Sequence, residues 1–313
     1  MSNSIVTIEN LVKRYNNLVA LDHFNLDIKE GEIFGLLGPN GSGKTTAINC
    51  ILSLLSYDKG SIQVFGKPMA PDNYQTKRKI GVVFQNVAVF DELTVYDNID
   101  YFCGLYVTDK AERKALVEEA ISFVGLEDFK KFYPKKLSGG LLRRLNIACG
   151  IAHKPNLIIL DEPTVAVDPQ SRNNILEGIQ KLNKNGATII YTSHYMEEVE
   201  QICTRIAIID KGRNLAEGTT EELKLMIKTG ETIMIEVFDL SEELLNQIKS
   251  IKHVFSVKYQ DHQLKIKCSG GKHNVVRVLS FLQEHEVSFG RVFSELPTLN
   301  DVFLEITGKE LRD

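Results

Sequence analysis

The segment GPNGSGKTT, residues 38–46, constrains the fold more than any other part of this sequence. It follows an apolar run, EIFGLL, and precedes AINCILSLL, which has the apolar spacing of a helix. A strand, a glycine-rich loop and a helix in this order are typical of a phosphate-binding loop, because the glycines let backbone N–H groups surround phosphate oxygens at the helix N-terminus. We therefore expect a chain built around a nucleotide phosphate site.

Nine residues of this loop are predicted to bind the nucleotide: Gly38, Pro39, Asn40, Gly41, Ser42, Gly43, Lys44, Thr45 and Thr46. Backbone N–H groups would surround the phosphates, Lys44 would reach the β- and γ-phosphates, and Thr45 would offer its hydroxyl to Mg²⁺. A glycine-rich turn without a ligand is the structural alternative. All fixed positions of the motif are present between a strand and a helix, which favours the phosphate site.

Six short apolar runs between residue 1 and about residue 217 predict an α/β domain with a largely parallel sheet, because helical segments are expected between them. Three of these runs, EIFGLL, NLIIL and ATIIYTS, are apolar throughout, as expected for central strands that are buried on both faces. The other three runs are IVTIENL, KIGVVF and RIAIID.

Two further segments have their own organisation. Residues 86–136 show helical apolar spacing without a strong strand, so we expect a helical insert within a domain that spans residues 1–220. Residues 221–313 alternate strands and helices in the order βαββαβ and end in a further helix. This order predicts a small ferredoxin-like α+β module.

Composition excludes several classes of protein. The 313 residues are 43% hydrophobic and 25% charged, with a formal net charge of -4, so the basic excess of a polybasic nucleic-acid binder is missing. No window approaches the roughly 18–20 apolar residues that a membrane-spanning helix needs, and we expect a chain that does not itself cross a membrane. Five scattered cysteines without a CxxC pair predict reduced thiols and a cytoplasmic location.

Two adjacent carboxylates, in the segment DEPT, directly follow the apolar run NLIIL. At the carboxyl end of a strand beside a phosphate loop, Asp161 could hold Mg²⁺, and Glu162 could orient or deprotonate an attacking water. An apolar strand that ends in Asp-Glu also occurs for structural reasons alone. The position downstream of a phosphate loop favours the catalytic interpretation.

Three more residues could contact the nucleotide, and each has a structural alternative. His194 follows ATIIYTS at a strand end, where it could touch the γ-phosphate and the water or be an ordinary histidine. Tyr15 could stack on adenine or be a half-exposed surface tyrosine. Gln85 ends KIGVVFQ and could give an amide oxygen to Mg²⁺ or cap the strand.

A second pair of glycines, Gly139 and Gly140, follows Ser138 directly ahead of a predicted helix. Glycines lower helix propensity and leave backbone N–H groups bare, which suits an anion better than a packed core. Because the chain already has a phosphate loop, the residues alone leave the purpose of this helix start open.

In combination, these segments resemble the nucleotide-binding subunit of ABC transporters over residues 4–220. The resemblance rests on YNNLVAL, GPNGSGKTT, Gln85, LSGG, LIILDEP, the VDP at residues 167–169 and His194, in this order. It implies ATP and Mg²⁺ as cofactors, ATP hydrolysis as the activity, and a head-to-tail pair of subunits with two ATP molecules between them. In such a pair, Ser138, Gly139 and Gly140 would bind the γ-phosphate held by the second subunit's phosphate loop.

The resemblance also implies a role for the remaining residues. Glu162 looks like the catalytic base, His194 like the γ-phosphate switch, and Tyr15 like the aromatic residue that stacks on adenine. Asp168 resembles an aspartate that crosses the dimer interface. Gln85 resembles the residue that links the nucleotide to the helical insert.

Two positions depart from the family pattern. Leu141 stands where the signature usually ends in glutamine, and VAV precedes Asp168 where smaller residues are commoner. A leucine cannot donate the side-chain hydrogen bond that a glutamine could. Neither change removes an expected phosphate ligand.

The C-terminal sequence LPTLNDVFLEITGKELRD and the segment TSHYMEEVEQICTRIAIIDKG narrow the resemblance to ATP-binding subunits of ABC-2 type exporters, including the daunorubicin- and linearmycin-resistance groups. The implied partners are a second ATP-binding subunit and permease subunits that dock on residues 86–136 at the inner face of the cell membrane. No nucleic-acid partner is expected. The alternative is a soluble ABC-type ATPase with a regulatory or repair role.

Overall fold

A computed structural model describes residues 3–308 of the chain, which form two compact units. The first unit ends at Gly218 and the second begins at Thr219. Among the helices of residues 3–308, none combines the length and the apolar character needed to cross a membrane.

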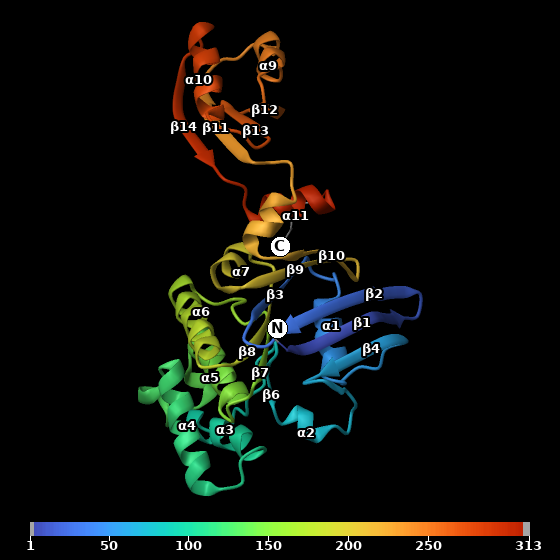
Figure 1. The fold of residues 1–313 in the computed structure, drawn as a ribbon. Coiled ribbons are helices and arrows are strands. Elements are labelled where there is room, and N and C mark those ends of the chain that lie inside the picture. The colour runs from blue at the N-terminus through green and yellow to red at the C-terminus, as the bar shows by residue number, and fades with distance from the viewer. Residues whose placement is uncertain (1–2, 309–313) are drawn as a thin grey trace. The chain divides into compact units, whose positions relative to one another are not determined.

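Six strands form the sheet from which the phosphate loop emerges (Figure 1). Their order is β10 (Arg213–Gly218), β9 (Arg205–Asp210), β3 (Ile33–Leu37), β8 (Thr188–Ser193), β7 (Leu157–Asp161) and β6 (Ile80–Val83). All neighbours are parallel except β9 and β10, and every residue of β3, β7 and β8 is buried. The predicted α/β fold with apolar central strands is therefore confirmed.

The first apolar run lies in a different sheet from the one that we expected. Four strands form a separate antiparallel sheet: β2 (Leu18–Lys29), β1 (Ser4–Tyr15), β4 (Lys59–Val64) and β5 (Lys67–Pro68). The expected helix after the first run is also wrong, because that segment is β2. Phe24, Leu26 and Ile28 are buried at every second position of β2, which is the period of a strand with one face on a core.

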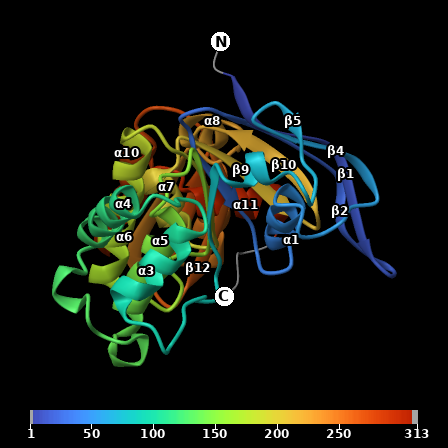
Figure 2. The ribbon, with the colours of Figure 1, turned by 90° about the horizontal axis from the view of Figure 1, so that it is seen from below.

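Helix α1 (Lys44–Ile51) begins at Lys44, within the phosphate-loop segment, and packs between the two sheets. Its residues Ile48 and Ile51 share one buried cluster with Phe24 of β2 and Leu36 of β3. Figure 2 shows α1 beside the antiparallel sheet, on the opposite side of the unit from the larger helices. Burial against both sheets holds the helix start, and with it the phosphate loop, in one place.

Six other helices belong to the first unit: α2 (Tyr74–Lys77), α3 (Val95–Gly104), α4 (Lys110–Val124), α5 (Gly139–Ile151), α6 (Pro169–Lys184) and α7 (Met196–Ile202). Helices α3 and α4 fall within residues 86–136 and pack against α5 (Figures 1 and 2). Two 3₁₀ turns, Glu127–Phe129 and Pro134–Lys136, connect α4 to α5. The segment expected to be a helical insert is thus helical in the structure.

The second unit opens with α8 (Thr220–Leu225) and continues as β11 (Glu231–Val237), α9 (Glu242–Ile248), β12 (Val254–Gln260), β13 (Gln263–Cys268), α10 (Asn274–Glu284), β14 (Phe289–Glu295) and α11 (Leu299–Thr307). Its strands form an antiparallel sheet in the order β12-β13-β11-β14. Ile235, Ile266 and Leu282 lie in one buried cluster between sheet and helices. The βαββαβ order predicted for this module is confirmed.

Candidate active site

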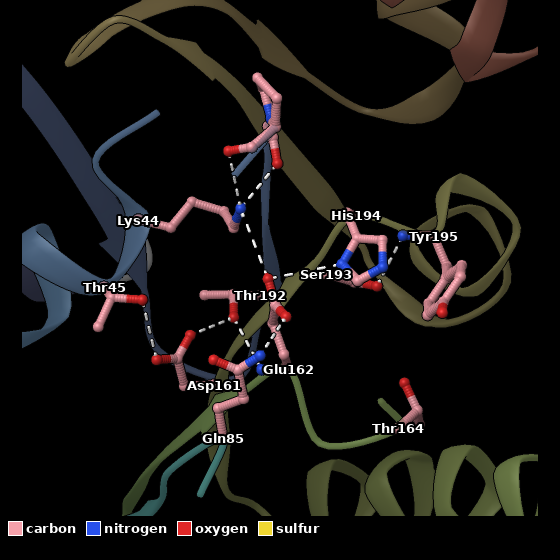
Figure 3. Close-up of polar contacts among 12 residues, drawn as sticks. Lys44, Thr45, Gln85, Asp161, Glu162, Thr164, Thr192, Ser193, His194 and Tyr195 are labelled. Carbon is pink, nitrogen blue, oxygen red and sulfur yellow. Dashed lines mark hydrogen bonds and ion pairs between the residues drawn. The ribbon is translucent and has the colours of Figure 1, made fainter. Parts of the chain in front are cut away.

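Four parallel strands end at the same edge of the six-stranded sheet, and predicted site residues follow each of them. β3 leads into the phosphate loop, β6 is followed by Gln85, β7 by Glu162 and β8 by His194. Parallel strands place their carboxyl ends at one edge, where α/β proteins bind ligands. Figure 3 shows these side chains facing one another although they are far apart in the sequence.

The phosphate loop contains close contacts that only glycine allows. A Cβ at Gly43, where φ is 111°, would lie 2.7 Å from the carbonyl oxygen of Ala20 in β2. A Cβ at Gly38 would lie 2.3 Å from the carbonyl oxygen of Ile209 in β9. Side chains at either position would push the loop away from these strands. The glycines therefore satisfy local packing in addition to any phosphate contact.

Lys44 is the first residue of α1, and its ammonium reaches back over the phosphate loop. Its Nζ donates hydrogen bonds to the carbonyl oxygens of Gly38 at 2.7 Å and Pro39 at 3.2 Å, and lies 3.6 Å from Oε1 of Glu162. Burial lowers the pKa of Lys44, while the charges of Glu162 and Asp161 act to raise it. An ammonium in this position can exchange its carbonyl partners for phosphate oxygens.

Asp161 is hydrogen-bonded from both sides of the site. Its Oδ2 accepts from the hydroxyl of Thr45 at 3.1 Å, and its Oδ1 accepts from the hydroxyl of Thr192 at 2.7 Å. Mg²⁺ prefers oxygen ligands and is usually held in proteins by one or two carboxylates together with substrate phosphates. The neighbouring carboxylate and hydroxyl therefore fit a magnesium ion. Sequence reasoning missed Thr192, which has no motif of its own.

The Glu162 carboxylate contacts Lys44, Gln85 and His194, and these four residues form the Glu162 cluster. Its Oε2 accepts a hydrogen bond from Nε2 of Gln85 at 3.1 Å, and its Oε1 lies 3.5 Å from Nδ1 of His194. Its backbone has a φ of 48°, in the left-handed region that glutamate rarely adopts. Such backbone strain is concentrated at functional sites in proteins. The carboxylate is only 8% exposed, so its contacts with Lys44, Gln85 and His194 form in a nearly dry environment.

Glu198 in α7 was not predicted as a functional residue. Its buried carboxylate accepts three hydrogen bonds at Oε2, from the hydroxyls of Thr164 at 2.8 Å, Tyr191 at 2.6 Å and Ser193 at 3.1 Å. Its Oε1 lies 3.2 Å from Nε of Arg172 in α6. Burial is the main cause that raises the pKa of Tyr191, with the Glu198 charge second.

The contacts of Glu198 join the two segments that carry catalytic candidates. Ser193 directly precedes His194, and Thr164 lies two residues after Glu162. One carboxylate therefore holds both segments at a fixed separation. In the sequence, Glu198 looks like any charged residue of an amphipathic helix, and only its burial distinguishes it.

We expect Glu198→Gln to lower the free energy of unfolding by about 2 kcal/mol, because the amide removes a buried charge to which three hydroxyls donate. Thermal unfolding of the full chain measures the change. Glu197→Gln, at the exposed neighbouring position of the same helix, should change it by less than about 0.5 kcal/mol. Equal effects of the two substitutions would contradict a role for the buried hydroxyl cluster.

Two predicted residues lie apart from the Glu162 cluster. Tyr15 ends β1 and is 45% exposed as a residue, and the Nζ of Lys13 lies 5.2 Å from the centroid of its ring. Asp168 is the N-cap of α6, where its carboxylate accepts a hydrogen bond from the backbone N–H of Ser171 at 2.9 Å. Hydrogen bonds that Ser171 donates to this carboxylate lower the pKa of Asp168. The exposed ring and carboxylate both remain available to a ligand or a second chain.

The second glycine pair lies at the start of α5, as its sequence predicted. Ser138 caps the helix, and its Oγ accepts a hydrogen bond from the backbone N–H of Leu141 at 3.3 Å. Ser138 and Gly139 are exposed, whereas Gly140 is buried. A Cβ at Gly140 would lie 2.5 Å from Oγ of Ser171 in α6. Gly140 therefore allows two helix starts to pack closely, while Gly139 leaves open surface above them.

Comparisons with known proteins agree with this arrangement. Residues 21–165 match the family model described as ABC transporter. The chain is 41% identical over 308 residues to the linearmycin resistance ATP-binding protein LnrL of Bacillus subtilis (strain 168), which covers 97% of this chain and 99% of that protein. It is 31% identical over 313 residues to the daunorubicin resistance ATP-binding protein DrrA3 of Streptomyces coeruleorubidus, covering 100% of this chain and 98% of that protein.

A solved structure extends the comparison to the fold. The ATP-binding cassette MJ0796, in a dimeric post-hydrolysis state bound to ADP and Pi, aligns with a TM-score of 0.63 and 29% sequence identity. The alignment covers 68% of this chain and 98% of that chain. The resemblance drawn from the sequence motifs is therefore confirmed by the relatives and by the fold.

Proposed function

This chain belongs to the family of ABC transporter ATP-binding proteins, and on that premise we propose that it hydrolyses ATP to power an exporter of a drug-, antibiotic- or lipid-like cargo. The observation that carries the proposal is the buried Glu162 carboxylate beside a phosphate loop, in contact with Lys44, Gln85 and His194. The relatives that support export are named for resistance to linearmycin and daunorubicin. The alternative of a soluble ABC-type ATPase has no comparable support.

Binding of ATP begins at the phosphate loop. The β- and γ-phosphates are attracted by the Lys44 ammonium and by the backbone N–H groups at the start of α1, because both place positive charge at the phosphate loop. Thr45 and Asp161 would hold Mg²⁺, which when bound supplies positive charge to the phosphate oxygens. The exposed Tyr15 ring would stack on the adenine.

Hydrolysis requires a water to be held in line with the γ-phosphate and to lose a proton. We assign the proton acceptance to Glu162, because its carboxylate is buried at the edge of the phosphate loop. Gln85 donates to one carboxylate oxygen and orients the group. His194 lies near the other oxygen, where its ring can contact the γ-phosphate. Positioning and electrostatics of this kind account for most catalysis of phosphoryl transfer.

A second chain would complete each site. Ser138 and Gly139 are exposed at the N-terminus of α5, where bare N–H groups favour the charge of a γ-phosphate. ATP held by Lys44 of one chain would thus be bound by α5 of another, and its hydrolysis would let the pair reopen. Asp168 at the exposed start of α6 would lie in the same interface. The dimeric state of the similar cassette MJ0796 supports this arrangement.

A mixture of two inactive variants tests the shared site. Lys44→Ala and Ser138→Arg should each abolish hydrolysis alone, but a one-to-one mixture should regain roughly one quarter of the unmutated rate. Half of randomly formed pairs then combine one intact phosphate loop with one intact helix start, and such pairs have one working site of two. Phosphate release by the full chain measures the rate. A mixture as inactive as its components would contradict the shared site.

A groove beside the helical insert is the proposed docking site of the permease. It encloses about 350 Å³ and is lined by residues that include Phe84, Ala88, Phe102 and Leu105. Leu54 also lines the groove, and it is 62% exposed, while Leu105 is 56% exposed. Exposed apolar side chains around a groove are typical of a protein interface. We propose that an ABC-2 type permease binds here, which would hold this chain at the cytoplasmic face of the membrane.

We expect Leu105→Arg to reduce the fraction of the chain that sediments with membranes of the source cells at least severalfold, because a charge would enter an apolar interface. ATP hydrolysis by the purified chain should stay unchanged. Leu225→Arg is the matched control, since Leu225 is 84% exposed and lies outside the groove. Membrane association that is insensitive to Leu105→Arg would place the permease elsewhere, and no association of the unmutated chain would favour the soluble alternative.

A further inference from the structure

Arg143, in the second turn of α5, is a buried arginine whose guanidinium donates only to backbone carbonyl oxygens in the hydrogen bonds that the structure describes. Nε donates to the carbonyl of Pro163 at 2.6 Å, and Nη2 donates to that of Glu162. Nη1 donates to the carbonyls of Phe84 at 3.0 Å and Gln85 at 2.8 Å. The side chain is 3% exposed, so these bonds form away from water.

A buried guanidinium is a costly way to stabilise a fold. Burial lowers the pKa of Arg143, although nearby Asp161 acts to raise it. Apolar side chains of similar volume often stabilise a core as well as or better than buried charges do. What an apolar side chain cannot do is fix four carbonyl groups in space, because it has no donors. The geometry of Arg143 therefore indicates a positioning role.

The carbonyls that Arg143 holds belong to both partners of one catalytic contact. Gln85 and Glu162 are hydrogen-bonded through their side chains, and Arg143 binds the backbone carbonyl of each. At Glu162, the backbone N–H donates to the hydroxyl of Thr192 at 2.9 Å, while the carbonyl accepts from Arg143. The left-handed backbone of Glu162, with φ of 48°, is thus held on both sides.

We propose that Arg143 is a positioning residue for hydrolysis, which fixes the Glu162 and Gln85 backbones so that the Glu162 carboxylate is aimed at the attacking water. The inference rests on the proposed function, because it presumes that Glu162 is the base. It assigns Arg143 to the hydrolysis site of its own chain, although Arg143 lies on the helix whose start would serve the site of a second chain.

The first test compares two neighbouring arginines. Arg143→Lys keeps the charge but cannot reach four carbonyls, so we expect kcat to fall about tenfold while the dissociation constant for ATP changes less than about twofold. Arg144→Lys is the control, because Arg144 donates to the carbonyls of Val124 and Gly125 instead. It should leave kcat within about twofold. Loss of ATP affinity together with kcat would assign Arg143 a structural role and overturn the proposal.

The second test uses the mixture of Lys44→Ala and Ser138→Arg chains, in which the only working site takes Glu162 from the Ser138→Arg chain. Adding Arg143→Lys to the Ser138→Arg chain should lower the rate of the mixture about tenfold. Adding it to the Lys44→Ala chain, which contributes only its helix start, should leave the rate unchanged. Equal losses in both mixtures would overturn the proposal. An inactive parent mixture would instead contradict the shared site, and the comparison of Arg143→Lys with Arg144→Lys would still decide the role of Arg143.

Discussion

Glu162→Gln should reduce ATP hydrolysis by about 10²- to 10⁴-fold while ATP remains bound, because an amide cannot accept the proton of the attacking water. The substitution preserves the size of the side chain. It removes a negative charge that lies 3.6 Å from Nζ of Lys44, so repulsion between the site and the γ-phosphate also falls. We therefore expect ATP affinity to be equal or higher, and ATP-bound pairs of chains to accumulate.

Phosphate release, binding of a fluorescent ATP analogue and the molecular mass in solution measure these three effects. Glu177→Gln is the matched control, since Glu177 is an exposed glutamate of α6 outside the site, and it should leave all three unchanged. Hydrolysis by Glu162→Gln at the unmutated rate would contradict the assignment of Glu162 as base. Loss of ATP binding would show instead that the carboxylate has a structural role.

Lys44→Ala should weaken ATP binding by a factor on the order of 10² or more. Two charge-assisted hydrogen bonds to phosphate oxygens are removed, each contributing about 1.5–3 kcal/mol. The loss is larger than that of the bonds alone, because the Lys44 ammonium separates the phosphates from the nearby carboxylates of Glu162 and Asp161. Without it, negative charges would face each other in a buried site.

Titration of the full chain with ATP at neutral pH measures this loss. Lys59→Ala removes an exposed lysine of β4 and should leave ATP affinity unchanged. An unchanged affinity in Lys44→Ala would contradict the phosphate-loop assignment. Taken with Glu162→Gln, the two substitutions separate binding from hydrolysis, since the first should abolish both and the second only hydrolysis.

The parallel strands were predictable from the sequence because a strand that is buried on both faces is a nearly continuous run of apolar residues. EIFGLL, NLIIL and ATIIYTS are predominantly apolar, and the strands that they contain, β3, β7 and β8, are buried at every residue. The residues of a strand do not show to which sheet the strand belongs. Residues 4–15 pair with β2 and β4 instead of the parallel sheet, since pairing depends on segments that are distant in the sequence. The strand β2 was missed for the same reason.

By itself, the sequence determined the residues that follow the strand ends. The glycine-rich loop, Asp161, Glu162 and His194 could be picked out as candidates because each comes directly after an apolar run that predicts a strand. These patterns lie within short segments of the sequence, so they can be recognised without knowledge of the fold. The expected meeting of these residues then followed from the geometry of parallel strands.

Only the tertiary structure decided how those groups are held. Arg143 has the charged neighbour Arg144 on its helix, Glu198 has Glu197 on its own, and nothing in the local sequence marks either residue as buried. Their partners are carbonyls and hydroxyls of segments up to 59 residues away, in contacts that form only when the sheet and helices pack. A hydrogen bond depends on distance and angle, which the order of residues does not specify. The sequence thus named the chemical groups, and packing set the geometry in which they can act.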